Sequence, residues 1–414
     1  MSRQYTISGI DIGNSQVKVI VARINSDGLK PEIIGSGSAP SNGLRRGVVV
    51  DMEETIENVR SAVQKAEAMA GISVKRAYLA VNGLHIHTQT SRGVIAVSRA
   101  DNEISQNDIE RVVKAASVVS LPPNREIIHV IAKNFIVDGT EYVKNPLGMK
   151  GVRLEADVLI VDGLSPYLKN VVKCINQNNI EVAGLVYAPM ASSLAVLDKN
   201  QKEYGVVNID FGGGTSSLAV YEEADLLHST TLPIGSRHIT NDLAVLLRTS
   251  LDVAERIKLE YGSTSDADDL RKRGEIDLSD LLGEKDFTVP KKQIIKVIDA
   301  RAHELFDIVS NELKKVSKSG LLPAGIVLSG GGVNLPGIVA LAKEKLRLPV
   351  RVARSVHFEG ISEVVDDPAF SVAMGSVLWG MDQELGGYGG KGVSPSGGSD
   401  GFKRFLGWLK NFLP

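Results

Sequence analysis

The 414-residue sequence contains a single cysteine, Cys174. One cysteine excludes an intramolecular disulfide framework and any zinc site with several cysteine ligands. No stretch approaches about 18 consecutive apolar residues, so a membrane-spanning helix is not expected. The first residues lack the long apolar segment of a secretory signal peptide, and no G-x-x-x-x-G-K-[ST] phosphate-binding loop is found. We therefore expect an intracellular protein without a transmembrane helix.

Charge of one sign is also lacking. The 47 basic and 49 acidic residues leave a net charge of −2, which gives no indication of nucleic-acid binding. A hydrophobic content of 43% excludes wholesale disorder. At about 150 residues per domain, the length predicts two or three domains. Strand and helix patterns alternate along the chain, which favours α/β layers.

The composition changes abruptly near the carboxyl end. Residues 386–401 contain eight glycines in sixteen and predict a flexible linker. On a helical projection of 402–414 the apolar side chains form one stripe: Phe402, Phe405, Leu406, Trp408, Leu409, Phe412 and Leu413. The basic residues Lys403, Arg404 and Lys410 lie opposite.

Such a helix would rise only about 18 Å, too short for a hydrocarbon core of about 30 Å. Its pattern predicts an amphipathic helix lying in the headgroup region of an anionic membrane. The alternative is a helix that docks into the protein's own core, and the glycine-rich linker argues against it.

Two segments about 200 residues apart share one plan. In each, an apolar strand ends in an aspartate, a glycine-containing turn follows, and a second apolar strand returns. The aspartates are Asp11 and Asp210. This repetition predicts a duplicated fold whose halves face each other.

The turns after these aspartates are candidate phosphate-binding sites. Glycine allows phosphate oxygens to approach backbone N–H groups closely. The candidate residues are Gly13, Asn14 and Ser15 in the first turn, and Gly212, Gly213, Gly214 and Thr215 in the second. Lys18 on the returning strand is placed to reach a phosphate, and Asp11 to lie beside a hydrated Mg²⁺. An ordinary hairpin is the alternative, especially for the first turn.

A third glycine cluster follows another apolar strand. Gly330, Gly331 and Gly332 precede Asn334, and Pro336 lies near an expected helix start. A nucleoside lying flat against the backbone would need such a turn. The alternative is simply a tight connection.

Together the three turns resemble the actin, Hsp70 and sugar-kinase superfamily. The motifs that correspond to this superfamily are the first phosphate-binding motif at 9–21, the second phosphate-binding motif at 205–221 and the adenosine-binding motif at 325–338. The two connecting helices correspond to Val182–Leu197 and Phe370–Gly380. The resemblance implies an actin-like α/β fold of two duplicated domains around a cleft that binds ATP and Mg²⁺. Asp11 and Asp210 would serve the cation, and Asp210 is the candidate catalytic residue.

Within that superfamily the chain most resembles the FtsA family of actin-like bacterial cell-division proteins. Residues 236–244 look like the start of its subdomain 2B. Residues 254–262 resemble the helix whose Glu and Lys contact adenosine in bacterial actins, here Glu255 and Lys258. These two residues share a helix face, and a surface ion pair is the alternative.

The segment 84–162 occupies the place of the family's inserted SHS2-like subdomain 1C. We expect strands at 84–90, 93–97, 126–137 and 154–161 around a helix at 105–118. The resemblance implies the following boundaries: 1–83, 163–200 and 356–385 for subdomain 1A, 201–227 and 304–355 for 2A, 228–303 for 2B, 386–401 for the linker and 402–414 for the membrane-targeting helix.

The family resemblance implies a filament-forming membrane adaptor. It would hold filaments of the tubulin-like FtsZ on the cytoplasmic face of the cell membrane, at the division septum. Subdomain 2B would contact the FtsZ C-terminal peptide, with Arg301 as a basic candidate, and subdomain 1C would contact neighbouring copies and later division proteins. Tyr187 and Ala188 stand where MreB-type actins carry acids, so we expect weak ATPase activity at most.

Two other interpretations of the function remain. A PilM-like pilus-assembly adaptor has a related fold and needs no amphipathic tail. A metabolite kinase would need a catalytic aspartate in a substrate-binding insertion, and we find no strong candidate. An MreB-like role is disfavoured by the position of the insertion.

Overall fold

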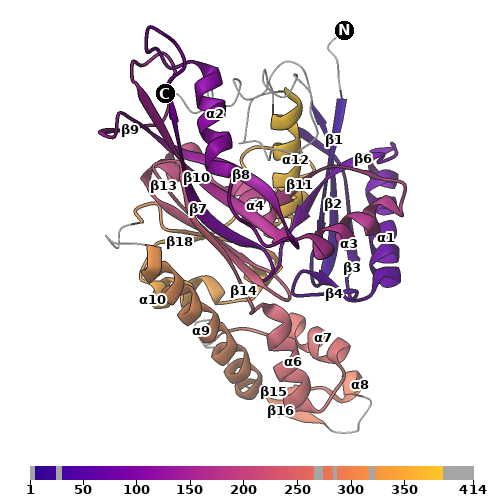
Figure 1. The fold of residues 1–414 in the computed structure, drawn as a ribbon. Helices are drawn as coiled ribbons and strands as arrows, with labels where there is room; N and C mark the ends of the chain where they lie inside the picture. The colour runs from indigo at the N-terminus through magenta and orange to yellow at the C-terminus, as the bar shows by residue number, and fades with distance from the viewer. Residues whose placement is uncertain (1–4, 25–29, 265–273, 283–286, 317–321, 386–414) are drawn as a thin grey trace.

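The computed structural model describes residues 5–24, 30–264, 274–282, 287–316 and 322–385. The expected linker and amphipathic tail, 386–414, lie outside the described residues. Two large mixed sheets form the body, a smaller sheet is attached to it, and a helical region extends from one end (Figure 1).

The first large sheet combines the amino-terminal strands with two later ones. Its order is β11-β6-β1-β2-β3-β19. The bounds are β1 Tyr5–Ile12, β2 Gln16–Ile24, β3 Glu32–Pro40, β6 Arg76–Val81, β11 Glu181–Tyr187 and β19 Glu359–Gly360. Val19, Ile20 and Val21 of β2 are all fully buried, because helices cover both faces of this sheet and a strand between two covered faces carries a continuous apolar run.

The helices of this domain are fixed by caps and close approaches. Helix α1 begins after Asp51, whose Oδ1 accepts a hydrogen bond from the Glu54 N–H, and it ends at the left-handed Gly71. The helices of this domain span Met52–Ala70 (α1), Ser165–Asn176 (α3), Ala188–Val196 (α4) and Ser371–Leu385 (α12). A two-stranded hairpin, β4 Leu44–Arg45 with β5 Val48–Val49, precedes α1.

The second large sheet repeats the plan of the first. Its order is β14-β13-β12-β17-β18, with β12 Val206–Phe211, β13 Ser216–Glu222, β14 Asp225–Leu232, β17 Ile326–Ser329 and β18 Val350–Val352. Strands β1 and β12 are each antiparallel to the strand that follows and parallel to a later one. Asp11 and Asp210 therefore lie at equivalent positions, which confirms the expected duplication.

Further helices belong to the second domain. They are α5 Lys199–Tyr204, α6 Ser236–Leu247, α7 Leu251–Tyr261, α8 Ser279–Leu282, α9 Lys291–Val316 and α10 Ile338–Leu346, with a short 3₁₀ turn at Gly331–Asn334. Helix α11 Ser362–Val365 and the 3₁₀ turn Pro368–Phe370 pack with the core of the first domain. Helices α6 and α7, the hairpin β15 Glu275–Asp277 with β16 Thr288–Pro290, and the amino-terminal part of α9 form the helical region at one end (Figure 1). Apolar side chains from these elements, including Leu243 and Ile298, share one core with the second sheet.

The inserted segment builds a third sheet with its own core. Its order is β7-β10-β8-β9, with β7 His87–Ala96, β8 Arg125–Val137, β9 Glu141–Val143 and β10 Arg153–Leu164, and α2 Gln106–Ser117 covers it. The expectation of separate strands at 84–90 and 93–97 was wrong, because β7 is continuous. Gly93 does not break the strand; its missing side chain lets the strand approach the backbone of α2 at Val112 and Ala116.

The expected connecting helix Val182–Leu197 was wrong in its first half. Residues 181–187 form β11, which pairs in parallel with β6, and the helix begins only at Ala188. The short apolar run before Pro189 suits an edge strand, and Pro189 then occupies the first turn of α4, where its missing N–H costs little.

The two domains are joined where α4 crosses α12. A Cβ built on Gly375 of α12 would overlap the carbonyl oxygen of Ala191 in α4. Ala373 and Ser376 beside it are also small and fully buried. Since α12 packs on β1 and β2 while α4 packs on β12 and β13, this crossing fixes the two sheets relative to each other. Among the described helices, none combines the length and hydrophobicity needed to cross a bilayer.

We predict that Gly375→Ala destabilises the protein. Helix propensity alone would favour alanine by about 1 kcal/mol, but the added methyl group cannot enter the crossing without separating the helices, and such overpacking costs about 1–3 kcal/mol. Chemical denaturation measures the net loss.

The matched control is Gly331→Ala, where the new Cβ would meet only the Ala369 Cβ at 3.9 Å. We expect its free energy of unfolding to stay within about 0.5 kcal/mol of the wild type. An unfolding free energy of Gly375→Ala equal to that of the control would contradict the role of this crossing.

Candidate functional site

A cavity of about 570 Å³ lies between the two large sheets. The β1–β2 turn borders it from one domain and the β12–β13 turn from the other, while the segment after β17 and helices α6 and α7 form the remaining wall. Its volume falls within the range of about 300–1,000 Å³ that is usual for small-molecule sites.

The cavity collects nearly all the site residues expected from the sequence. Its lining includes Asp11, Gly13, Asn14, Ser15, Lys18, Asp210, Gly212, Gly213, Thr215, Glu255, Lys258, Gly330, Gly331, Gly332 and Asn334. Gly214 instead packs against the side chain of Asn14, which a Cβ at this glycine would approach to 2.8 Å. Residues more than 300 positions apart in the chain therefore border one space.

The tips of the two hairpins touch across the cavity. Asn14 Nδ2 donates to Thr215 Oγ1 at 3.5 Å. A Cβ on Gly213 would overlap Ser15 Oγ. Gly213 and Gly214 are thus explained first by the close approach of the hairpins, whereas a Cβ on Gly212 would meet the carbonyl oxygen of Thr215 in its own turn.

The three glycines after β17 differ in what they need. Gly330 has a positive φ of 86°, and a Cβ there would lie 2.6 Å from Asp210 Oδ1. A Cβ on Gly332 would lie 2.5 Å from the Phe211 ring. Packing therefore requires both to be glycine. Gly331 has neither constraint, yet it lines the cavity, so a ligand is the better reason for its missing side chain.

Asp11 and Asp210 place two carboxyl groups in the same part of the cavity. Desolvation, together with the nearby Asp11, raises the pKa of Asp210 to about 7, although Lys18 opposes the shift. Desolvation also raises the pKa of Asp11, against the effect of Lys18. Ionisation of both carboxyl groups would concentrate negative charge in this part of the cavity, and a bound cation would make that ionisation easier.

Glu255 and Lys258 form an ion pair in the wall made by α7. Lys258 Nζ donates to Glu255 Oε2 at 2.7 Å and to Thr240 Oγ1 at 3.0 Å. The Lys258 side chain is only 9% exposed. The Glu255 side chain is 42% exposed, so the pair borders the cavity with its cation buried and its carboxylate partly open to solvent.

Arg301 lies away from the cavity, on α9. Its Nε donates to Asp242 Oδ2 at 2.8 Å and its Nη1 to Glu304 Oε2 at 2.5 Å. The guanidinium thus ties α9 to α6, and any other carboxylate would compete with two existing partners.

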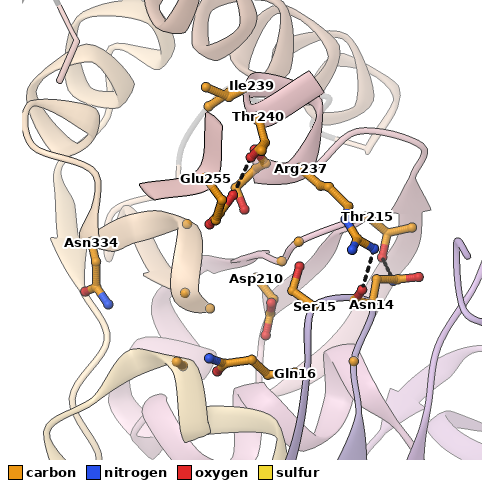
Figure 2. Close-up of a pocket in the computed structure, with 18 of the residues that line it drawn as sticks. Asn14, Ser15, Gln16, Asp210, Thr215, Arg237, Ile239, Thr240, Glu255 and Asn334 are labelled. Atoms are coloured by element: carbon orange, nitrogen blue, oxygen red, sulfur yellow. Dashed lines mark hydrogen bonds between the residues drawn. The ribbon is translucent and has the colours of Figure 1, made fainter. Parts of the chain in front are cut away.

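Several lining residues were not anticipated from the sequence. Asn82 donates to Ser217 Oγ at 2.7 Å and accepts from Thr231 Oγ1 at 2.7 Å, so it joins the two domains. Arg237 donates to the Asn14 carbonyl oxygen at 3.1 Å (Figure 2). A lone polar residue such as Asn82 carries no sequence signal for a partner 135 positions away.

The start of α4 borders the cavity with Ala188. Tyr187 before it is fully buried, and its hydroxyl accepts a hydrogen bond from Ser229 Oγ at 3.1 Å. At this point of the wall the cavity therefore meets the methyl group of Ala188, which cannot act as a base, while the Tyr187 phenol lies outside the lining.

Comparison with known proteins identifies the family. A family model described as the SHS2 domain inserted in FtsA matches residues 83–162, and one described as cell division protein FtsA matches 207–375. The FtsA of Pseudomonas aeruginosa is 35% identical over 394 residues, which cover 95% of this chain and 93% of that protein. The chain belongs to the FtsA family.

Two further FtsA proteins extend the match. That of Bacillus subtilis is 37% identical and covers 89% of this chain and 82% of its own length. The FtsA of Escherichia coli K12 is 32% identical, and the match covers 98% of this chain and 97% of that protein. This FtsA-family protein therefore has an actin-like role in cell division, as the sequence predicted.

Solved structures show the same fold at low identity. A chain of the PilM–PilN type IV pilus biogenesis complex has a TM-score of 0.64 at 16% identity and covers 90% of this chain and 98% of its own. MreB5 of Spiroplasma citri, bound to ADP, has a TM-score of 0.52 at 15% identity, and the match covers 90% of this chain and 95% of the MreB5 chain. The fold class, an actin-like fold with an inserted SHS2 domain, is confirmed.

The paired carboxyl groups generate a pH prediction. The folded protein retains the Asp210 proton up to about pH 7, whereas the unfolded chain releases it near the ordinary pKa of 3.8. The free energy of unfolding should therefore decrease as the pH rises from about 4 to about 7 and this contribution should level off above that.

Asp210→Asn removes this ionisation, so we expect it to raise the unfolding temperature near pH 8 in EDTA and to have little effect near pH 4. Thermal unfolding of both proteins across this range measures the difference. A difference that does not change with pH would show that Asp210 keeps an ordinary pKa.

Proposed function

We propose that this protein binds ATP in the cleft and assembles into filaments that hold FtsZ on the cytoplasmic face of the cell membrane at the division septum. The observation that carries the nucleotide part is the cavity bordered by all three glycine turns. Membership of the FtsA family supports the cell-division part.

The lining suggests how the nucleotide would lie. Glu255, Lys258, Gly331 and Asn334 border the part of the cavity that we assign to adenosine. The hairpin tips with Ser15 and Gly213 would hold the phosphates through backbone N–H groups. Bare backbone at Gly331 leaves room for a flat base, and the hairpin amides supply donors for phosphate oxygens.

Mg²⁺ fits the same site. Asp11 and Asp210 offer two carboxylates, and Mg²⁺ usually binds one or two carboxylates together with substrate phosphates and water. Among the described residues no cluster of three or more His, Cys, Asp or Glu could hold a metal ion, so the cation would be shared with phosphate. When bound, it would neutralise phosphate charge.

Turnover would be slow. At the start of α4 only the methyl group of Ala188 borders the cavity among residues 187 and 188, and no carboxylate stands there, so Asp210 is left as the group that orients water. The nucleotide would then serve mainly as a structural ligand that sets the state of the cleft. This fits a polymerising adaptor better than a metabolite kinase.

Attachment to the membrane would come from residues 402–414. The apolar stripe and the opposite basic face are read from the sequence, and partial insertion of such a helix gives reversible binding to anionic lipid. The glycine-rich residues 386–401 would let the body move freely relative to the membrane.

Partner contacts would be divided among the subdomains. The helical region 228–303 would bind the FtsZ C-terminal peptide, and Arg301 would take part only by exchanging Asp242 or Glu304 for an acidic side chain of the peptide. The inserted subdomain would contact neighbouring copies and later division proteins. The separate core of the inserted sheet supports the proposed boundaries of 1C, whereas the core of 1A continues into the second domain at Val206, Ala219 and Val327.

A PilM-like adaptor is the second candidate. The similarity to the PilM–PilN complex favours it, but at 16% identity that similarity concerns the fold alone. The amphipathic tail and the FtsA relatives favour the division role.

We predict that Gly331→Val weakens binding of Mg-ATP by at least about tenfold, because the branched side chain would occupy the space assigned to the base. The protein itself leaves room for it, since only Ala369 lies within 4 Å of the new Cβ. Isothermal titration calorimetry measures affinity and thermal unfolding measures stability.

Gly213→Val is the less informative choice, because its side chain would also push Ser15 and the first hairpin away. Unchanged affinity in a stable Gly331→Val protein would refute this placement of the nucleotide.

We predict that the full chain carries FtsZ to anionic liposomes and that removal of residues 402–414 abolishes this while ATP binding persists. Phe405→Glu places a charge on the apolar stripe and should release the protein from liposomes. Asn411→Glu adds the same charge on the opposite side of the helical projection and is the matched control. Co-sedimentation measures both.

Equal sedimentation of the truncated and full-length proteins, with neither polymer pelleting alone, would exclude the tail as the anchor. Binding to liposomes without recruitment of FtsZ would favour the PilM-like role.

A further inference from the structure

Arg237 stands where the two hairpins meet. It lies in the first turn of α6, and its backbone N–H donates to the Gly213 carbonyl oxygen at 2.7 Å. The neighbouring Ser236 N–H donates to the Gly212 carbonyl oxygen at 2.9 Å. The start of α6 is thereby attached to the second hairpin, and Arg237 cannot move independently of it.

The Arg237 side chain crosses to the other domain. Its Nη1 donates to the carbonyl oxygen of Asn14, at the tip of the first hairpin, at 3.1 Å. Its Nη2 donates to Asn42 Oδ1 at 3.2 Å. Figure 2 shows the guanidinium reaching Asn14 and Thr215, at the end of the cavity opposite Asn334.

The charge of Arg237 is not balanced by a neighbour. Both acceptors are neutral, and among the described residues Arg237 forms no ion pair. Arg92, Arg125 and Arg354 each bind a carboxylate. A guanidinium has five N–H donors in a fork that matches phosphate, and two donors are accounted for here. A cation held between two phosphate hairpins without an anion is the arrangement expected of an anion-binding residue.

The position along the cavity indicates which phosphate Arg237 would meet. The residues assigned to adenosine include Asn334, at one end of the cavity in Figure 2, and Arg237 lies at the other. A nucleotide extended between these ends places its last phosphate nearest Arg237. We propose that Arg237 binds the terminal phosphate of a nucleoside triphosphate and thereby distinguishes a triphosphate from a diphosphate. This rests on the proposed nucleotide binding.

The same residue would carry the nucleotide state to the helical region. Arg237 begins α6, and Asp242 on α6 binds Arg301 on α9. Exchange of the neutral Asn14 carbonyl for a phosphate oxygen gives a stronger, charge-assisted hydrogen bond. The start of α6 is bonded to the second hairpin, so the two move together. A shift of Arg237 toward phosphate would therefore displace the hairpin, α6 and the ion pair between α6 and α9.

The test is the ratio of two affinities in Arg237→Gln. We expect its affinity for Mg-AMPPNP, a non-hydrolysable triphosphate, to fall about 10–100-fold, as expected for loss of a hydrogen bond to a charged group. Its affinity for Mg-ADP should stay within about twofold. Arg256→Gln, an exposed arginine on α7 outside the cavity lining, is the matched control and should change neither affinity.

Arg237→Lys keeps the positive charge and replaces Arg237→Gln in the test if the glutamine variant unfolds. The lysine variant should lose less affinity for the triphosphate than the glutamine variant, and its affinity for Mg-ADP should not change. Equal losses for both nucleotides, or no loss in either variant, would overturn the assignment of Arg237. Wild-type protein that binds neither nucleotide would instead overturn the proposed function, and so the two failures are distinguishable.

Discussion

The close approach of α12 to α4 is the contact on which the rest of the structure depends. Backbone meets backbone there, because Gly375 leaves no side chain between its helix and Ala191. Since each helix packs on a different large sheet, their separation sets how far apart the sheets lie. The hairpins at the ends of those sheets then meet closely enough for Asn14 to bond Thr215 across the domains.

Charge in the cleft is arranged in advance of any ligand. Two carboxyl groups with raised pKa values lie near Lys18, and at the hairpin tips Arg237 is held by neutral oxygens alone. Ionising the buried carboxyl groups is costly in isolation, because desolvated charges lack full compensation, and the arginine has no carboxylate partner among the described residues. A magnesium nucleotide would supply a cation for the first and an anion for the second, so a single ligand would relieve both.

The inserted domain is attached to both halves of the body. His129 of β8 accepts a hydrogen bond from the Tyr187 N–H at the start of α4, and its ring lies against Trp379 of α12. Lys144 binds Asp225 of the second domain at 2.6 Å. A change at the α4–α12 crossing would therefore reach the surface of the insertion through packed side chains. Burial lowers the pKa of His129 to about 3, so this connection stays neutral at physiological pH.

The sequence by itself determined the duplicated strand plan, the three glycine turns and the position of the insertion, because local periodicity and clusters of small residues leave a direct record in the chain. It did not reveal that 181–187 is a strand, since a short apolar run before a proline suits a helix or an edge strand equally. Only the tertiary structure decided which glycine is free of packing, that Arg301 already has partners, and that Asn82 and Arg237 join the domains. Most of those contacts, such as Arg301 with Asp242 and Asn82 with Ser217, join residues more than 50 positions apart, and no local pattern encodes which distant oxygen a side chain will meet.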